Sequence, residues 1–187
     1  GATISARRSR TGRRSPIRPT PPRFAPTQIN DVVRETFDLL RPEIDNRGVT
    51  VHEKLARHAP LLPADAVQIK QILVNLIKNA LQAMTRGGVL TVRTEPGSDG
   101  LWLTVSDNGG GISPEQAKRI FEPFYTTKKK GSGLGLMIVQ RIVRDHGGRM
   151  ELESKREQGT SFRIGLPSQE RRPRLLEAGV TPPTEGR

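Results

Sequence analysis

Residues 65–84 read DAVQIKQILVNLIKNALQAM, and their periodicity predicts one long amphipathic helix. At about 100° per residue, one side of this helix gathers the apolar residues Ile69, Ile72, Leu73, Leu76, Ile77, Ala80 and Met84. An adjoining arc of about 80° gathers the amides Gln68, Gln71, Asn75, Asn79 and Gln82. Amides beside a core lower stability unless they are hydrogen-bonded. The stripe is therefore either a solvated face or a row of neutral ligands facing a bound polyphosphate and its metal.

The segments around this helix predict two layers, one of helices and one of strands. Before it, Asn30 is expected to cap a helix with apolar residues at helical spacing up to Ile44, and Val49, Val51 and Leu55 alternate as in a strand. After it come strands at 89–95 and 101–106 joined by a hairpin at 96–100, a short helix with a Ser113–Gln116 capping box, a helix at 134–146, and strands at 149–154 and 160–166. This order predicts a two-layer α/β sandwich, with three main helices on one face of a mixed sheet.

Charge and composition divide the chain of 187 residues into a body and two tails. Residues 1–30 hold seven Arg and no acidic residue, which is more than half of the net charge of +12. We expect residues 1–26 to form a basic, Pro- and Arg-rich flexible linker, 27–168 a folded domain, and 169–187 a flexible tail. Cys is absent and no apolar run is long enough to span a membrane. The expectation is a cytoplasmic chain without membrane contact.

The run Asp107-Asn108-Gly109-Gly110-Gly111-Ile112 follows a predicted strand directly. A carboxylate at a strand end can accept a hydrogen bond from an exocyclic amine, and glycines let the backbone come close to a flat ring. Taken alone, the same run is also compatible with an ordinary turn.

A second glycine-rich run, Gly131-Ser132-Gly133-Leu134-Gly135-Leu136, follows three lysines, of which the first is Lys128, and opens the helix predicted at 134–146. Backbone N–H groups at a helix N-terminus bind phosphate, and nearby lysines add positive charge. The run lacks the Lys-Ser/Thr of a P-loop and does not follow a strand as a dinucleotide fingerprint does. By itself it could equally be a linker.

In this order and spacing, the motifs resemble the GHKL ATPases and, among them, the catalytic domains of sensor histidine kinases. Residues 75–80 look like the N box, 107–112 like the first Gly box, Phe121-Glu122-Pro123-Phe124 like the F box, and 131–136 like the second Gly box. Residues 158–162 resemble the closing strand. The resemblance covers about residues 27–168, implies the Bergerat fold, and is greatest for the nitrogen-regulation subgroup.

The resemblance also assigns roles to single residues. Asn79 would bind the Mg²⁺ that bridges the phosphates of ATP, and Asn75 would lie beside these phosphates. Asp107 would accept from the adenine amine, in a base pocket formed with Gly109, Gly111 and Ile112, and Thr160 would lie near the adenine. Lys128 and the segment Gly131, Ser132, Gly133, Leu134, Gly135 and Leu136 would hold the triphosphate. Asn75 and Lys128 are the candidate catalytic residues.

Asn75 separates two branches of this resemblance. Members that hydrolyse ATP or phosphorylate serine usually carry Glu at this position, where a carboxylate can take a proton from water or a hydroxyl. An amide cannot, whereas an imidazole acceptor has a lone pair of its own. Asn75 therefore indicates a histidine as the phosphate acceptor.

None of the three histidines fits the family's acceptor, which lies on a separate dimerisation domain in a run beginning His-Glu. His52 is expected on the polar side of a strand, His58 in a loop, and His146 at a helix end where a cation suits the dipole. The resemblance thus implies a monomeric fragment of a larger kinase, with that dimerisation domain and a response regulator as partners. The alternatives are a GHKL ATPase, a non-enzymatic ATP-binding module or, because of the Arg-rich start, a basic nucleic-acid-binding protein.

Overall fold

The computed structural model describes residues 20–85, 87–122 and 134–169. In chain order the elements are β1 (Ala25–Gln28), α1 (Ile29–Asn46), β2 (Thr50–Lys54), β3 (Leu61–Ala64), α2 (Ala66–Ala83), β4 (Val89–Gly97), β5 (Gly100–Asp107), α3 (Pro114–Arg119), α4 (Gly135–Asp145), β6 (Arg149–Lys155) and β7 (Gly159–Pro167). Five strands form one sheet in the order β2-β4-β5-β7-β6. The β2–β4 pair is parallel and the other pairs are antiparallel.

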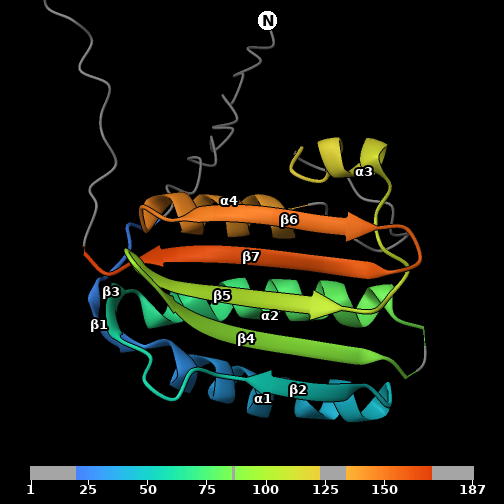
Figure 1. Cartoon of the computed structure of the whole chain (residues 1–187), viewed down its shortest axis with the longest axis horizontal. Helices are drawn as coiled ribbons and strands as arrows, with labels where there is room; N and C mark the ends of the chain where they lie inside the picture. Colours follow the sequence, from blue (N-terminus) through green and yellow to red (C-terminus); the bar gives the residue numbers. More distant parts are fainter. Residues whose placement is uncertain (1–19, 86, 123–133, 170–187) are drawn as a thin grey trace, which may run out of the picture.

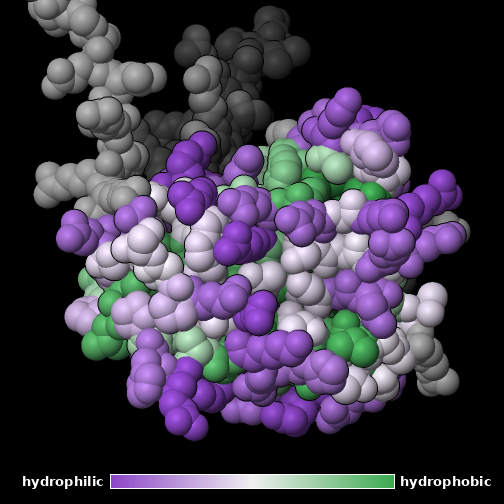
Figure 2. All heavy atoms as spheres, in the orientation of Figure 1, coloured by the Kyte–Doolittle hydropathy of each residue, from purple (hydrophilic) through white to green (hydrophobic). Residues whose placement is uncertain are grey.

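The helices α1, α2 and α4 cover one face of this sheet, as Figure 1 shows. Their apolar residues and the alternate residues of β4, β5 and β7 form one buried core, in which Ile69, Leu76, Leu90, Leu103 and Ile164 are at most 1% exposed. The predicted α/β sandwich, with three main helices on one face, is confirmed. In the orientation of Figure 2 the uncovered face of the sheet is largely hydrophilic, with scattered hydrophobic patches.

The cap of α1 differs from the prediction. Gln28 is the N-cap and its side chain accepts from the backbone N–H of Asn30, which is itself inside the helix and buried. The Asn30 amide donates to the carbonyl of Ala56 at 2.9 Å and accepts from the hydroxyl of Thr94 at 2.8 Å. These long-range hydrogen bonds satisfy the amide and take it away from a capping role.

A second, two-stranded sheet was not predicted. β1 and β3 pair in antiparallel fashion, with Ala25 opposite Ala64 and Gln28 opposite Leu61. The expected linker included Ala25 and Pro26, which the structure instead assigns to β1. Both strands have four residues and contain a proline, so neither carries the alternation that marks a strand in sequence.

The described part of the chain contains no helix both long and apolar enough to cross a membrane.

Candidate functional site

Three polar residues form a row across one end of the five-stranded sheet. Asp107 on β5 lies directly opposite Thr160 on β7, and Thr160 lies directly opposite Ser154 on β6. Directly opposed residues project to the same face. Here that face is the helix-covered one, because Leu103 and Val105 project from the same face of β5 as Asp107 and are buried. Thr160 is 7% exposed, so the row lies at the margin of the core.

The loop after Asp107 packs against the end of α2. The Asp107 Oδ1 atom accepts from the backbone N–H of Gly109 at 2.8 Å, and the N–H of Gly110 donates to the carbonyl of Ala83 at 3.2 Å. A Cβ atom at Gly109 would lie 2.6 Å from that same carbonyl oxygen. Only glycine allows this approach, which holds the loop against the last residue of α2.

The other side of this loop is fastened to the β6–β7 hairpin. The N–H of Glu157 donates to the carbonyl of Gly110 at 2.7 Å, and the N–H of Ile112 donates to the hydroxyl of Ser154 at 2.8 Å. Gly111 has a positive φ of 68°, and a Cβ atom there would lie 2.1 Å from the carbonyl oxygen of Lys155. The glycines predicted to shape a base pocket thus bring three segments of backbone together.

Asn75 and Asn79 lie one helical turn apart on α2, and both are half-buried. The Asn75 amide donates to the carbonyl of Gln71 at 2.9 Å. A Cβ atom at Gly135 would lie 2.9 Å from Oδ1 of Asn75, so glycine is needed where α4 begins. The predicted N box therefore adjoins the second Gly box, of which Leu134, Gly135 and Leu136 are described.

Several predicted site residues lie outside the described residues. They are Lys128, Gly131, Ser132 and Gly133, together with Pro123 and Phe124 of the F box. Phe121 is described and packs, partly buried, against the core.

The stripe of amides on α2 is divided between two environments. Gln68 donates from Nε2 to the carbonyl of Thr20 at 3.3 Å, so this amide contacts the segment before β1. Gln71 and Gln82 are exposed. The interpretation of all five amides as a single row of ligands therefore does not hold for Gln68.

His146 corrects a second expectation. This residue is 2% exposed, its Nε2 accepts from the N–H of Asp65 at 3.1 Å, and its Nδ1 contacts the carbonyl of Ile142 at 2.8 Å. Burial lowers the pKa of His146, against the opposing influence of the Ile142 carbonyl and of Asp65. The side chain is thus a neutral member of the core and not a cation at a helix end. His52 and His58 are exposed, as predicted for His52.

Sequence reasoning missed Ser154 and Asn108. Ser154 links Ile112 to Thr160, and Asn108 accepts at Oδ1 from the N–H of Val89 at 2.8 Å. A hydroxyl in a strand is unremarkable in sequence. The register of the β6–β7 hairpin, counted back from its turn, would have placed Ser154 opposite Thr160.

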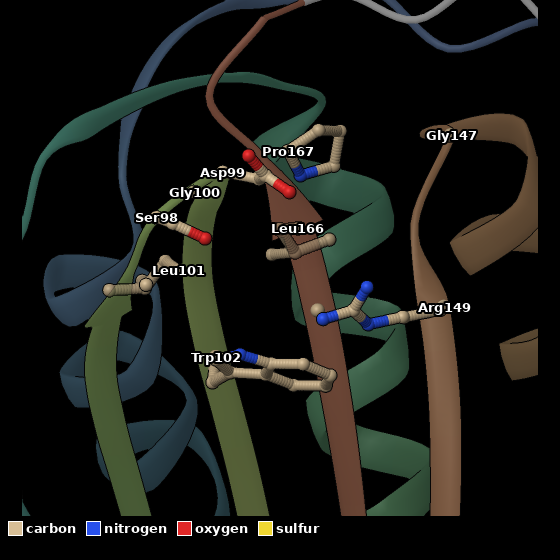
Figure 3. A pocket seen from close by; sticks show the side chains of 11 residues that line it. Ser98, Asp99, Gly100, Leu101, Trp102, Gly147, Arg149, Leu166 and Pro167 are labelled. Atoms are coloured by element: carbon tan, nitrogen blue, oxygen red, sulfur yellow. The ribbon is translucent and has the colours of Figure 1, made fainter.

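A small pocket lies at the opposite end of the sheet. It has a volume of about 60 Å³ and is lined by residues that include Ser98, Asp99, Trp102, Arg149 and Leu166 (Figure 3). Ligand pockets usually enclose about 300 Å³ or more, so this pocket is too small for a nucleotide. The guanidinium groups of Arg149 and Arg163 lie 4.5 and 3.9 Å from the centre of the Trp102 ring, which they help to cover.

Comparisons with known sequences agree on one family. Residues 64–170, more than half of the chain, match the family described as histidine kinase-, DNA gyrase B- and HSP90-like ATPase. The sensor protein TdiS of Thauera aromatica is 36% identical over 152 residues, which are 78% of this chain and 28% of TdiS. The sensor histidine kinase ZraS of Salmonella typhi is 38% identical over 144 residues, 74% of this chain and 30% of ZraS. The chain thus spans about a third of the length of these relatives.

Solved structures agree in fold. The nucleotide-free catalytic domain of histidine kinase ThkA is 31% identical, with a TM-score of 0.71 over 78% of this chain and 96% of that domain. Full-length ShkA in complex with AMPPNP is 29% identical, with a TM-score of 0.68 over 80% of this chain and 32% of ShkA. ThkA in complex with the response regulator TrrA is 28% identical, with a TM-score of 0.70 over 80% of this chain and 43% of ThkA. The chain therefore belongs to the histidine kinase-, DNA gyrase B- and HSP90-like ATPases, and it contains the ATP-binding catalytic domain of the sensor histidine kinase type.

Proposed function

We propose that this chain is the part of a sensor histidine kinase that binds Mg-ATP and donates its γ-phosphoryl group to a histidine on a separate dimerisation domain, for relay to a response regulator. The observation that carries the proposal is the meeting of three motifs around α2. The Asp107–Gly111 loop packs on Ala83 at its C-terminal end, and the start of α4 adjoins Asn75.

In this proposal the adenine lies at the row of polar side chains and the phosphates lie toward α4. Asp107 accepts from the exocyclic amine, with Gly109, Gly111 and Ile112 around the ring and Thr160 beside it. Backbone N–H groups at the start of α4 favour negative charge. We assign Lys128 and the segment from Gly131 to Leu136 to the triphosphate on sequence grounds.

The donor set fits a magnesium ion that is shared with the phosphates. Asn79 offers a neutral amide oxygen on the helix face that also carries Asn75, and Mg²⁺ takes few protein ligands beside water and phosphate oxygens. When bound there, Mg²⁺ would neutralise phosphate charge during transfer. Asn79 would hold the ion, while Asn75 would lie beside the phosphates.

Asn75 supports transfer to a histidine over hydrolysis. Its amide donates to the Gln71 carbonyl and cannot act as a general base. An imidazole needs no such base to attack phosphorus, whereas water does. The proposal therefore includes slow turnover of ATP in the absence of the dimerisation domain.

The remaining assignments of the proposal follow from this role. The catalytic domain would begin at β1, whose first residue is Ala25, and extend to about residue 168, between the linker and the tail at 169–187. The isolated chain would be a monomer because the family's dimer contacts lie elsewhere. The domain would work in the cytoplasm, where ATP is available. It would have no specific nucleic-acid partner and would not itself contact a membrane.

Incubation with γ-labelled ATP tests the proposal. Alone, the chain should acquire no acid-labile phosphate, because phosphoryl transfer needs the acceptor in line with the γ-phosphate. Mixed with the dimerisation domain of its parent kinase, it should label that domain's histidine, and Asp107→Asn should remove the labelling. Steady hydrolysis at about 1 s⁻¹ or more without an acceptor would favour an ATPase instead. Binding of ATP with neither transfer nor hydrolysis would favour a non-enzymatic module.

A further inference from the structure

The hydroxyl of Ser154 makes three short contacts at once. Its Oγ accepts from the N–H of Ile112 at 2.8 Å, donates to the carbonyl of Gly159 at 3.0 Å, and lies 2.9 Å from the hydroxyl oxygen of Thr160. Each partner belongs to a segment that borders the proposed base site. Ser154 itself is half-buried on β6 and lies behind Thr160 as seen from Asp107.

Counting protons fixes the direction of the Ser154–Thr160 hydrogen bond. A serine hydroxyl has one proton, and a carbonyl oxygen can only accept, so the Ser154 proton points to Gly159. The contact between the two hydroxyls then requires Thr160 to donate. Ser154 is thereby satisfied by two acceptances and one donation, and the proton of Thr160 is directed away from Asp107.

We infer that Ser154 is a specificity-determining residue, because it holds the Thr160 hydroxyl as an acceptor toward the base. The inference rests on the proposed function. Asp107 and Thr160 are opposed in register, so the site would present two acceptors side by side. A purine with an amine at position 6 can donate to such a pair. A purine with a carbonyl at position 6 would place a third acceptor against it, and its N–H at ring position 1 can satisfy only one member of the pair, so this arrangement costs affinity.

Ser154→Ala would release this constraint. Without the Ser154 oxygen the Thr160 hydroxyl can rotate and donate toward the base, which suits a carbonyl as well as an amine. The ratio of affinities for ATP and inosine triphosphate should therefore fall by about 2- to 10-fold, the range that corresponds to one neutral hydrogen bond. A merely structural role would weaken both nucleotides equally and leave the ratio unchanged.

The experiment measures the dissociation constants of ATP and inosine triphosphate, with Mg²⁺, for the whole chain and its variants. Ser154→Thr keeps the hydroxyl and should keep the wild-type ratio. Ser106→Ala is the matched control. It breaks a hydrogen bond of 2.8 Å between the hydroxyls of Ser106 and Ser161, which lie on the face of the sheet that the helices do not cover. This variant should also keep the wild-type ratio. Thr160→Val removes the hydroxyl itself and should lower the ratio even if Ser154→Ala fails to fold.

The outcomes separate this inference from the proposed function. Wild-type selection of ATP with an unchanged ratio in Ser154→Ala, or in Thr160→Val, would overturn the inference and leave the proposed function intact. Failure of the wild type to bind either nucleotide would overturn both.

Discussion

The two ends of β5 differ in what covers them. Glycines at both ends admit close backbone, since a Cβ atom at Gly100 would lie 1.9 Å from the carbonyl oxygen of Leu166. At the Gly100 end, the Trp102 ring covers Gly165, where a Cβ atom would lie 3.1 Å from the indole, and Arg149 and Arg163 pack on the ring. At the Asp107 end, glycines admit backbone and leave side-chain oxygens at the margin of the core. The first end is closed by the protein's own side chains, whereas the second retains polar groups for a ligand. Stability and nucleotide binding should therefore respond to different substitutions.

The largest difference between the two ends should come from Asp107→Asn. The N–H of Gly109 already donates to Oδ1 of Asp107, and an adenine amine would be a second donor. An asparagine has only one oxygen for two donors, so one of them would face an NH₂ group. ATP affinity should fall by roughly 10- to 100-fold, equivalent to about 1–3 kcal/mol. Calorimetry with a non-hydrolysable ATP analogue measures this, with Trp102→Phe as the control at the other end. Equal affinities in wild type and Asp107→Asn would contradict the assignment.

Two glycine substitutions should distinguish the two ends by their effects on stability and on ATP binding. Alanine at Gly109 would press its Cβ against the backbone carbonyl of Ala83, which cannot yield easily. Gly109→Ala should lower the free energy of unfolding by about 1–3 kcal/mol and weaken ATP binding. Gly165→Ala meets only side-chain atoms of Trp102 and Arg149, and should cost less than about 1 kcal/mol with ATP affinity unchanged.

Urea denaturation followed by the fluorescence of the single tryptophan measures the free energy of unfolding of both variants, and calorimetry measures their affinity for the ATP analogue. If Gly165→Ala impaired nucleotide binding as much as Gly109→Ala, the two ends would not be separable.

Acid should act on stability through His146, whose chain neighbour Gly147 lines the Trp102 pocket. Burial lowers the pKa of His146, so the unfolded chain takes up a proton that the folded chain resists. The contribution of His146 to the free energy of unfolding should be fully present above its ordinary pKa of 6.5. This contribution should be lost as the pH falls below that value.

Urea denaturation at pH 7.5 and pH 5.5 checks this, and His146→Gln, which cannot titrate there, should flatten the pH dependence. A steeper dependence in His146→Gln than in the wild type would contradict this explanation.

The smallest effect is expected from Arg149→Ala. A partly exposed cation–π contact contributes about 0.5–1 kcal/mol, and Arg163 would still cover one side of the ring. The free energy of unfolding should fall by that amount and ATP affinity should not change. A loss of ATP affinity in this variant would link the two ends energetically.

Local patterns explain why the three helices and the β4–β5 and β6–β7 hairpins could be predicted. Their apolar spacing, caps and turn glycines lie within a few residues of one another. β1 and β3 could not be predicted, because each is short and exists only through pairing across more than thirty residues. The role of Asn30 also escaped prediction, since its partners Ala56 and Thr94 are distant in sequence.

The residues of the candidate site were likewise only partly predictable from the sequence. Asp107, Gly109, Asn75 and Gly135 were predicted from the resemblance of their motifs, and the structure brings the two loops to α2. Ser154 was not predicted, because its importance comes from strand register and from the direction of one proton. The pKa of His146 could not be inferred from its position at a helix end, because burial by other elements controls it.

In the proposed function, nucleotide binds at the Asp107 end of the sheet. Titration of the isotopically labelled chain with a non-hydrolysable ATP analogue and Mg²⁺, followed by nuclear magnetic resonance, tests it most directly. We expect large shifts of the backbone amide signals of Gly109 and Ile112, while the indole N–H signal of Trp102 stays in place. Shifts of the Trp102 indole without shifts at Gly109 and Ile112 would contradict it.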